Sequence, residues 1–149
     1  MSARRVKTFW DEFVTATGTA GTYEAWAFGD EGKPDLADRL AQLVLHGPKR
    51  ATTDLYDLLR REGEPLPGVG SHNVVLDSRG DPVCIIVTTS VEVARFGDVD
   101  EEFAWVEGEG DRSLEYWRRA HTNYWASIGE TVEDDTRVVL ERFELVWPR

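Results

Sequence analysis

Apolar residues in the first part of the chain recur at helical spacing. Aromatic side chains in segment 9–13 predict a first amphipathic helix, and leucines and a valine at i, i+4, i+7 and i+8 predict a second over residues 34–46. A third helix is expected over about residues 53–61, where leucines line one side and a glycine follows. The aromatic-rich segment 23–30 connects the first two of these helices, and its pattern leaves its structure open. Residues of about 5–62 are therefore expected to form a helical N-terminal part.

The pattern changes after the proline- and glycine-rich loop 65–70. Apolar and β-branched residues predict strands over 74–76 and 83–93. The intervening Asp77–Asp81 segment, Asp-Ser-Arg-Gly-Asp, is rich in turn residues. The two strands are therefore expected to form an antiparallel hairpin.

The last third of the chain combines helices with one more strand. Residues 100–107 predict one or two helical turns, 113–127 a long helix, and 136–147 a final strand. The apolar positions of this strand change parity between Leu140 and Phe143, which predicts a β-bulge there.

This order of elements predicts an α+β domain. Helices come first, and a small, mostly antiparallel sheet follows, which a curled barrel would accommodate. The chain has 149 residues, of which 41% are hydrophobic and six are tryptophans, enough for one core but not for two. We expect a single domain over residues 1–149, with its β-rich part and one long helix in about residues 70–149.

The charge of the chain limits its partners. A net charge of -11 argues against a protein that coats nucleic acid along an extended footprint, although a local pocket for one nucleotide remains compatible. The single cysteine, Cys84, excludes an internal disulfide and a multi-cysteine metal site. No secretory h-region follows the basic N-terminus, and no run approaches the roughly 18 apolar residues of a membrane span. We expect a cytoplasmic protein with no membrane partner; its oligomeric state is not set by these features.

The first candidate for chemistry is the turn Gly47-Pro48-Lys49-Arg50-Ala51-Thr52. Lys49 and Thr52 are three residues apart beside the expected start of the third helix, so both can face the same space. A helix start offers free N–H groups to an anion or oxyanion, and a desolvated lysine can act as base toward a threonine hydroxyl. In the simpler interpretation, Thr52 or Thr53 caps the helix and Lys49 is solvated.

A second candidate is the acidic segment from Glu107 to Asp111. Glu107, Glu109 and Asp111 stand within five positions, and two glycines separate them. Such acids need cationic partners, and arginines on the following helix could supply them. The segment is compatible with a general acid or base, with an oxygen-ligand metal site, or with a simple helix cap at Asp111.

The helix after this segment carries Trp117, Arg118 and His121 on one side by spacing. His121 is expected to be partly buried, either as a hydrogen-bonded core residue or as a catalytic one. Trp117 is expected to be a core residue or a platform for a stacked base. The chain contains no Gly-x-Ser-x-Gly elbow, Walker loop, dinucleotide-binding glycine motif or His-Glu-x-x-His helix, so several common chemistries are excluded.

Taken in order, the motifs of the chain resemble those of the ASCH domain family. The resemblance covers about Trp10 to Trp147. Seven short motifs carry it: Trp26–Asp30, Gly47–Thr52, Glu64–Gly70, Val75–Asp77, Phe103–Ala104, Glu107–His121 and Val139–Glu144.

The resemblance implies a PUA-like fold, a small β-barrel with helices packed around it, and a cleft that meets RNA or modified nucleosides. The resemblance also implies a range of activities, since some ASCH proteins are RNA-binding modules, some are ribonucleases and some are small amidohydrolases that remove the acyl group from N4-acetylcytidine. The amidohydrolase type uses a lysine, a threonine three positions later and a distant glutamate. Lys49, Thr52 and Glu107 match these three positions. Two departures are Pro48, where many relatives have lysine, and Asp54, where a small polar residue is usual.

Two functions from different classes follow. In the first, Thr52 attacks the acyl group of an N4-acylated cytidine-like nucleoside, Lys49 takes the proton and Glu107 delivers it to the leaving amine. In the second, the protein is a binding module for RNA or a nucleotide-bearing ligand. We expect its ligand contacts at Trp26, Arg50, Asp111, Trp117, Arg118 and His121.

A nucleoside or short RNA is thus the expected partner, and whether the protein is an enzyme stays open. We expect no cofactor and no bound metal. A divalent metal would be needed only in a variant of the second function, a ribonuclease that uses the acids from Glu107 to Asp111.

Overall fold

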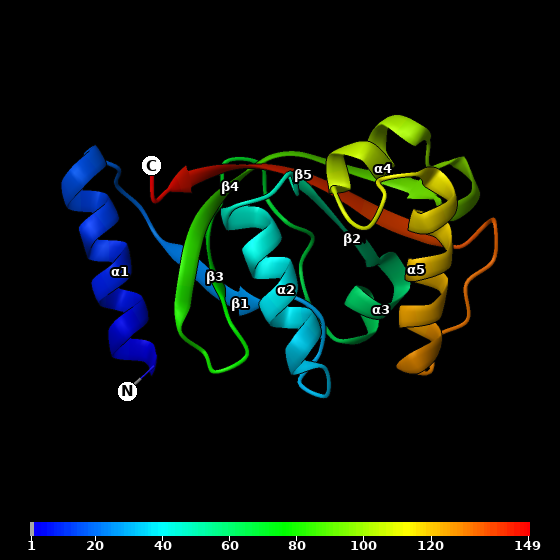
Figure 1. Cartoon of the computed structure of the whole chain (residues 1–149), viewed down its shortest axis with the longest axis horizontal. Coiled ribbons are helices and arrows are strands. Elements are labelled where there is room, and N and C mark those ends of the chain that lie inside the picture. Colours follow the sequence, from blue (N-terminus) through cyan, green and yellow to red (C-terminus); the bar gives the residue numbers. More distant parts are fainter. Residues whose placement is uncertain (1) are drawn as a thin grey trace.

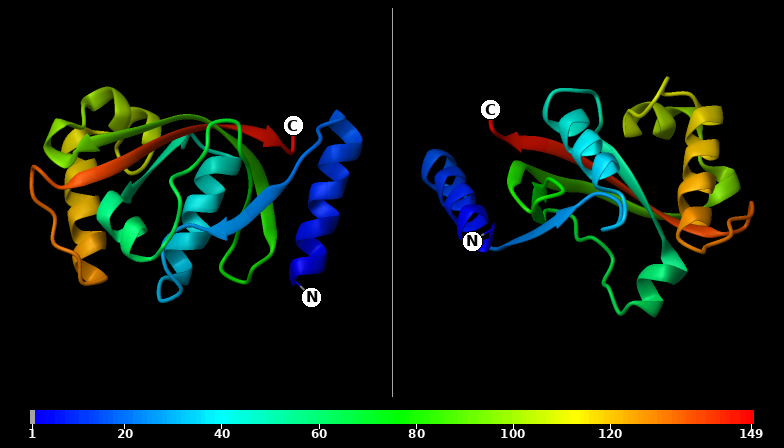
Figure 2. Two further views of the ribbon diagram at one scale, coloured as in Figure 1. Left: turned by 180° about the vertical axis from the view of Figure 1, so that it is seen from behind. Right: turned by 60° about the horizontal axis from the view of Figure 1, so that its bottom comes forward.

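A strongly curved five-stranded sheet runs through the centre of the computed structural model, which describes residues 2–149 (Figure 1). The strand order is β1-β3-β4-β5-β2; the β1–β3 pair is parallel and the other pairs are antiparallel. The sheet curls into a half-barrel that remains open between its edge strands β1 and β2 (Figure 2). The strands are β1 (Tyr23–Ala27), β2 (Ala51–Leu55), β3 (His72–Leu76), β4 (Pro82–Arg95) and β5 (Arg137–Trp147).

Helices surround this sheet and complete the predicted α+β architecture. They are α1 (Ser2–Thr17), α2 (Pro34–Leu45), α3 (Tyr56–Arg61), α4 (Glu101–Glu107) and α5 (Leu114–Ser127), with a short 3-10 helix η1 (Phe96–Asp98). Helix α1 lies at one end of the molecule, α4 and α5 lie at the other, and α2 lies between them (Figure 1). None of the helices within residues 2–149 combines the length and apolarity that a membrane crossing requires.

Most elements predicted from the periodicity are confirmed. The first, second and last long helices correspond to α1, α2 and α5, and the hairpin corresponds to β3 and β4. Helix α2 begins with Pro34 in its first turn, where the missing N–H removes no hydrogen bond. Helix α5 begins after Ser113, whose hydroxyl accepts a hydrogen bond from the Tyr116 amide at 3.0 Å.

The prediction of a helix over residues 53–61 is wrong in its first part. Residues 51–55 form β2, and only the segment from Tyr56 is helical. Burial alternates along β2, with Ala51, Thr53 and Leu55 buried and Thr52 between them partly exposed. This period of two is that of a strand, and the leucines of α3 extended the helical pattern too far toward the N-terminus. The N-terminal part is therefore not purely helical, since it also contributes β1 and β2.

The bulge predicted between Leu140 and Phe143 lies instead on the neighbouring strand. Pairing moves from Thr88 opposite Phe143 to Ser90 opposite Arg142, so the extra residue is Thr89 of β4. Four consecutive residues of β5, from Val138 to Glu141, are buried, so side chains on both faces of the strand are buried there. Burial on both faces removes the alternation on which the prediction depended.

Three apolar clusters hold the helices to the sheet. One joins α4 and α5 to β2 and β5, the second packs α2 on β3, β4 and β5, and the third packs α1 on β3 and β4. The first cluster contains Trp117 and Trp125, and the second contains Phe28 and Val44. These clusters fix α2 and α5 on opposite sides of the opening in the half-barrel.

Candidate ligand cleft

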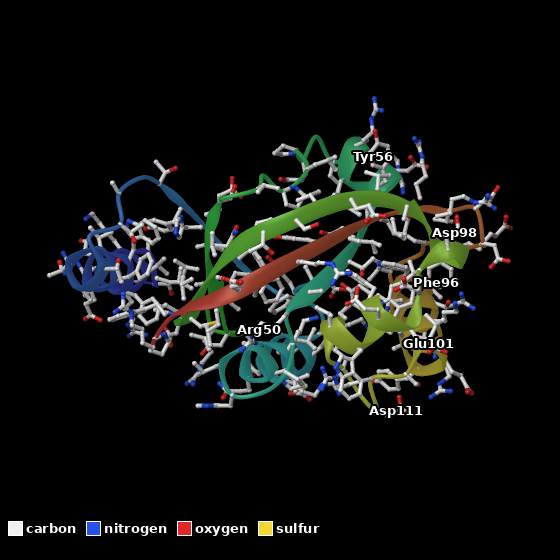
Figure 3. The ribbon with its side chains drawn as sticks, turned by 90° about the horizontal axis from the view of Figure 1, so that it is seen from above. Arg50, Tyr56, Phe96, Asp98, Glu101 and Asp111 are labelled. Carbon is white, nitrogen blue, oxygen red and sulfur yellow. The ribbon has the colours of Figure 1, made fainter. Side chains whose placement is uncertain are left out.

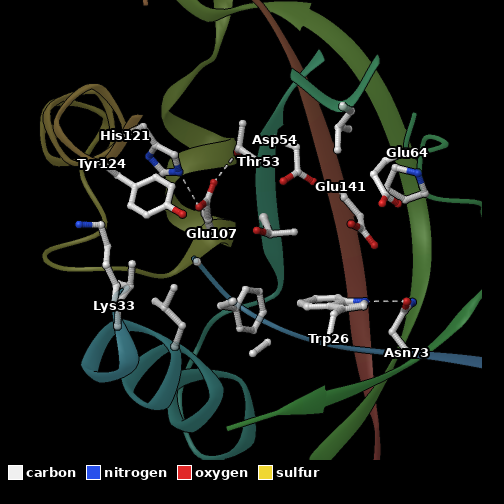
Figure 4. Close-up of a pocket in the computed structure, with 18 of the residues that line it drawn as sticks. Trp26, Lys33, Thr53, Asp54, Glu64, Asn73, Glu107, His121, Tyr124 and Glu141 are labelled. Atoms are coloured by element: carbon white, nitrogen blue, oxygen red, sulfur yellow. Dashed lines mark hydrogen bonds and ion pairs between the residues drawn. The ribbon is translucent and has the colours of Figure 1, made fainter. Parts of the chain in front are cut away.

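A cleft of about 1350 Å³ opens between α2, α5 and the two edge strands of the sheet (Figure 4). Its lining includes residues 22–27 of the β1 edge, residues 52–54 of β2, and residues 64–68 of the loop after α3. Because β1 and β2 do not pair with each other, the cleft is the unclosed seam of the half-barrel. It contains both hydrophobic walls and a row of acidic side chains.

Glu107, the last residue of α4, is the most constrained of these acids. Its side chain is 1% exposed and its Oε1 accepts hydrogen bonds from Thr53 Oγ1 and Trp117 Nε1, both at 2.7 Å. Its Oε2 lies 2.9 Å from His121 Nε2 and 3.5 Å from Lys49 Nζ. Four donors from three parts of the chain thus converge on one carboxylate.

The contacts of His121 favour a proton on each ring nitrogen. Its Nε2 faces the Glu107 carboxylate, and its Nδ1 lies 2.8 Å from the Trp117 carbonyl oxygen. A carboxylate and a carbonyl oxygen can only accept hydrogen bonds, so these contacts favour the imidazolium form of the ring. Burial alone would lower the pKa of His121, but the Glu107 carboxylate raises it above its usual value.

Lys49 is completely buried and supplies the other positive charge. Its Nζ donates to the Ala51 carbonyl at 2.8 Å and to Glu109 Oε2 at 2.9 Å, and it lies 5.3 Å from the Phe28 ring centroid. The sequence-based hypothesis required Lys49 and Glu107 to line the same cavity. The two side chains lie 3.5 Å apart, but only Glu107 belongs to the lining of the cleft.

The two cations set the ionisation of the two glutamates. Burial tends to raise the pKa of Glu107, but His121 and Lys49 outweigh it and hold this pKa well below its usual range. Burial and the Glu107 charge raise the pKa of Glu109, against the opposing effect of Lys49. Of the two glutamates, Glu109 therefore holds a proton more readily than Glu107.

The cluster of Glu107, Glu109 and His121 resembles a metal site in geometry only. Ligand atoms of Glu107, Glu109 and His121 lie within 4.8 Å of one another. The Lys49 ammonium, however, already contacts both carboxylates, and a doubly protonated imidazole cannot bind a metal. The residues therefore fit an internal network of ion pairs rather than a metal ion.

Two further carboxyl groups, Asp54 and Glu141, lie on the floor of the cleft (Figure 4). Glu141 of β5 is paired directly opposite Thr52 of β2, and its Oε2 accepts from Thr88 Oγ1 at 2.7 Å. Burial and then the charge of Glu107 raise the pKa of Asp54 to about 6. Burial also raises the pKa of Glu141, although the Thr88 hydrogen bond opposes it.

Sequence reasoning missed Glu141 and treated Asp54 only as a departure from the family pattern. The available signal was a single acid in the apolar run Val138-Val139-Leu140-Glu141. A charged residue in such a strand is rarely buried unless it has a partner or a function.

Trp26 of β1 forms part of the opposite wall. Its indole Nε1 donates to Asn73 Oδ1 at 2.9 Å, and its ring meets Phe28 edge to face, with centroids 4.9 Å apart. These two contacts fix the orientation of the indole, which is only partly buried and borders the cleft (Figure 4).

Among the residues predicted to contact a ligand or to act in catalysis, Trp26, Thr52, Glu107 and His121 line the cleft. Lys49 lies behind the lining and reaches it through Glu107 and Glu109.

The remaining four predicted ligand contacts lie outside the lining of the cleft. The Arg50 guanidinium donates to the Val44 and Lys49 carbonyls, whereas Arg118 donates to the Gly97 carbonyl at 3.0 Å. Asp111 is exposed at the edge of the molecule and caps the turn before α5, by accepting from the Ser113 amide (Figure 3). Trp117 is a core residue that stacks on Phe96 and holds Glu107.

Comparison with known proteins identifies the family. The family model of the ASCH domain matches residues 24–147. The chain belongs to the ASCH domain family. Members of this family are generally thought to bind RNA. No curated protein matches the chain.

Solved structures agree with this assignment. The ASCH domain of Lactobacillus crispatus JV V101 is 32% identical, with a TM-score of 0.84 over 95% of this chain and 94% of its own. Protein EF3133 of Enterococcus faecalis V583 is also 32% identical, with a TM-score of 0.84 over 97% of this chain and 89% of its own. The hypothetical protein PH0355, at 17% identity and a TM-score of 0.51 over 73% of this chain and 93% of its own, is similar in fold alone. The predicted PUA-like α+β fold of this ASCH domain is thus confirmed.

Proposed function

We propose that this ASCH domain binds one nucleoside, or the base of one unpaired nucleotide of a short RNA, in the cleft between β1 and β2. The observation that carries the proposal is the Trp26 indole, fixed by Asn73 at the wall of a cleft whose floor holds Thr52, Asp54 and Glu141. Proteins recognise unpaired bases by stacking them on aromatic rings and by hydrogen-bonding their edges. The cleft supplies both kinds of contact.

The distribution of charge supports a ligand no larger than a few nucleotides. The acids on the floor repel phosphate, so a nucleotide would enter with its base first. Lys33 and Arg39 border the cleft from α2 and its N-terminal end, and neither forms an ion pair with any residue of the range 2–149. They are placed to meet one or two phosphates outside the acidic floor.

Calorimetric titration with nucleosides and with short single-stranded RNA tests the proposal. Replacing Trp26 by alanine should weaken binding about 5- to 150-fold, because a stacked base contributes about 1–3 kcal/mol. Trp105→Ala is the matched control, since Trp105 is 57% exposed on α4 and lies outside the lining. Absence of nucleoside binding, or equal affinities in the two variants, would contradict the proposal.

Amide hydrolysis of an N4-acylated cytidine is the second candidate, and the position of Thr52 favours it. Thr52 lines the cleft, and its hydroxyl makes no hydrogen bond to any residue of the range 2–149. A threonine nucleophile needs an adjacent base. Transfer of a proton from Lys49 Nζ to Glu109, 2.9 Å away and with a raised pKa, would leave a neutral amine behind the lining of the cleft. The hydrolysis hypothesis assigns this amine the role of the base.

Deacylation of N4-acetylcytidine by the Thr52→Val variant separates chemistry from binding. Valine preserves the shape of threonine and removes the hydroxyl, so release of cytidine should fall to background while affinity for cytidine changes little. Product is measured by chromatography. Full turnover by Thr52→Val would eliminate Thr52 as the nucleophile. Lys49→Ala is a poorer probe, because it leaves two buried glutamates without their cation.

A metal-assisted ribonuclease would use the cluster of Glu107, Glu109 and His121. The Lys49 ammonium and the imidazolium of His121 oppose this third possibility. RNA cleavage that stops in chelator and returns with Mn²⁺ or Mg²⁺ would establish it in place of the other two.

A further inference from the structure

Two carboxyl groups on the floor of the cleft, Asp54 and Glu141, have few hydrogen-bond partners within residues 2–149. Glu141 is 4% exposed, and only its Oε2 accepts a hydrogen bond, from Thr88. Asp54 accepts none from any residue within the range 2–149, and neither acid forms an ion pair there. Asp54 is partly exposed to the cleft, and Glu141 is buried with one oxygen unpaired, which is unfavourable. Both groups are therefore suited to receive donors from a ligand.

The strand register places these acids on one surface. Thr52 and Asp54 are two residues apart on β2, so both project to the same face, and Glu141 is the direct cross-strand neighbour of Thr52. All three line the cleft, and Thr88 of β4 borders it beside Glu141. The floor is therefore a continuous patch of two carboxyls and two hydroxyls.

We propose that Asp54 and Glu141 are the specificity-determining residues of the cleft and select a base with an exocyclic amino group over its oxo counterpart. The inference rests on the proposed function, the binding of a nucleoside in this cleft. Amino groups of cytosine and adenine donate N–H to a carboxylate. The oxo group of uracil or hypoxanthine can only accept, so it would face a second acceptor and leave both unpaired.

The ionisation of Asp54 and Glu141 determines how strict this selection is. The pKa of Asp54 is raised to about 6 and that of Glu141 is also raised, mainly by burial. A carboxyl that keeps its proton offers a donor beside an acceptor and can pair with either member of each pair of bases. The selection therefore depends on the ionised carboxylates, which can only accept and so match the amino N–H of cytosine and adenine.

Other charged groups around Asp54 do not supply this recognition. Glu107 and Glu62 raise its pKa, and Lys49 and His121 lower it, yet none of them donates a hydrogen bond to its carboxyl. The two cations are occupied by Glu107 and Glu109. No donor within residues 2–149 would therefore compete with a donor of the ligand for the Asp54 carboxyl group.

Calorimetric titration with the matched pairs cytidine and uridine, and adenosine and inosine, tests the proposal. The wild-type protein should prefer each amino nucleoside by at least about tenfold, because a site built for an N–H donor rejects an analogue that lacks it. In the double variant Asp54→Asn, Glu141→Gln, each new amide offers a donor to the oxo oxygen and an acceptor to the adjacent N–H. The preference should therefore fall by about tenfold or reverse.

Asp35→Asn is the control, since Asp35 is an exposed acid at the rim of the cleft, and it should leave both ratios unchanged. Circular dichroism confirms that each variant is folded. Equal wild-type affinity for the two members of each pair, or an unchanged preference in the double variant, overturns the inference but leaves nucleoside binding intact. Absence of binding to all four nucleosides overturns the proposed function and this inference together.

Discussion

Glu107 shows how one residue can organise the site. Its carboxylate accepts from β2 through Thr53 and from α5 through Trp117 and His121, and it also pairs with Lys49. A buried charge with this many donors is stable as long as its partners remain, and removal of one partner leaves the others uncompensated. The residue is therefore a structural anchor as well as a wall of the cleft.

Glu107→Gln should destabilise the fold by about 3–5 kcal/mol, the range observed when one partner of a buried ion pair is removed. The glutamine amide would place a donor against groups that are themselves donors. Urea denaturation measures the effect. Glu102→Gln, which breaks an exposed pair with Arg142, serves as the control and should cost at most about 1 kcal/mol. Similar losses in the two variants would show that the Glu107 network is not a stabilising unit.

Asp54 should make the fold less stable as the pH rises. Its pKa is about 6 in the folded protein against an ordinary value of 3.8, so the folded state binds the proton more tightly than the unfolded chain. Stability is then fully present below pH of about 4 and declines between about 4 and 6, by up to about 3 kcal/mol. Asp54→Asn should therefore raise the melting temperature at pH 7.5 and change it little at pH 4. The same shift at both pH values would refute the linkage.

For single residues, the sequence predicted part of the site. The match to family motifs placed Lys49 with Glu107, and helical spacing placed His121 toward the interior. Thr53 was missed as a donor to Glu107 because a helix was expected there, and in a strand Thr52 and Thr53 point to opposite faces. Contacts of this kind depend on the register of the strand, which the residue types alone do not predict.

The end of α4 meets the turn of residues 47–50 at unusually close range. The Arg50 amide donates to the Val106 carbonyl at 2.9 Å, and Gly108 caps α4 with a left-handed φ of 76°. A Cβ on Gly108 would lie 2.7 Å from Lys49 Cα, which is backbone and cannot move aside easily. This contact between two elements sets the distance from Lys49 to the acids.

Gly108→Ala should therefore destabilise the protein by at least about 3 kcal/mol, from left-handed strain of about 1–2 kcal/mol together with the steric clash. Gly63→Ala is a closely matched control, because Gly63 has a φ of +71° and no atom within 4 Å of the added Cβ. The loss of stability in Gly63→Ala should reflect the left-handed backbone strain alone. Thermal unfolding compares the two variants, and equal losses would disprove the close packing of the turn on α4.

Elements with strong periodicity were predictable, and the edge strands were not. Helices α1, α2 and α5 each bury one stripe, and the β3–β4 hairpin has turn residues at its tip. Strands β1 and β2 have five residues each, and partly exposed side chains face the cleft. The burial pattern of these two strands depends on the cleft and on residues distant in sequence. Local strand propensity therefore predicts them poorly.

The charge of the whole molecule determines how much nucleic acid it can hold. The net charge of -11 and the acidic floor leave Lys33 and Arg39 as the cations beside the cleft that are free of ion pairs within residues 2–149. The α+β class was predictable from the order of elements, and the composition predicts that no extended nucleic-acid footprint exists. The open seam was not, because closure of a barrel depends on the curvature of the sheet.

Binding of a short single-stranded RNA should depend weakly on salt. With one or two phosphates neutralised, the logarithm of the affinity should fall with the logarithm of salt concentration with a slope of about -0.7 to -1.4. Replacing Lys33 and Arg39 by glutamine should bring the slope toward zero. A slope steeper than about -4 in the wild-type protein would reveal a long phosphate footprint and contradict a site for a single base.

The central claim is that the seam between β1 and β2 holds a base between Trp26 and the carboxyl floor. A crystal structure of the protein soaked with cytidine tests it most directly. We predict density for the base stacked on the Trp26 indole, with its amino nitrogen within hydrogen-bond distance of Asp54 or Glu141. Density for the nucleoside elsewhere on the protein, with the seam free of it, would contradict the account.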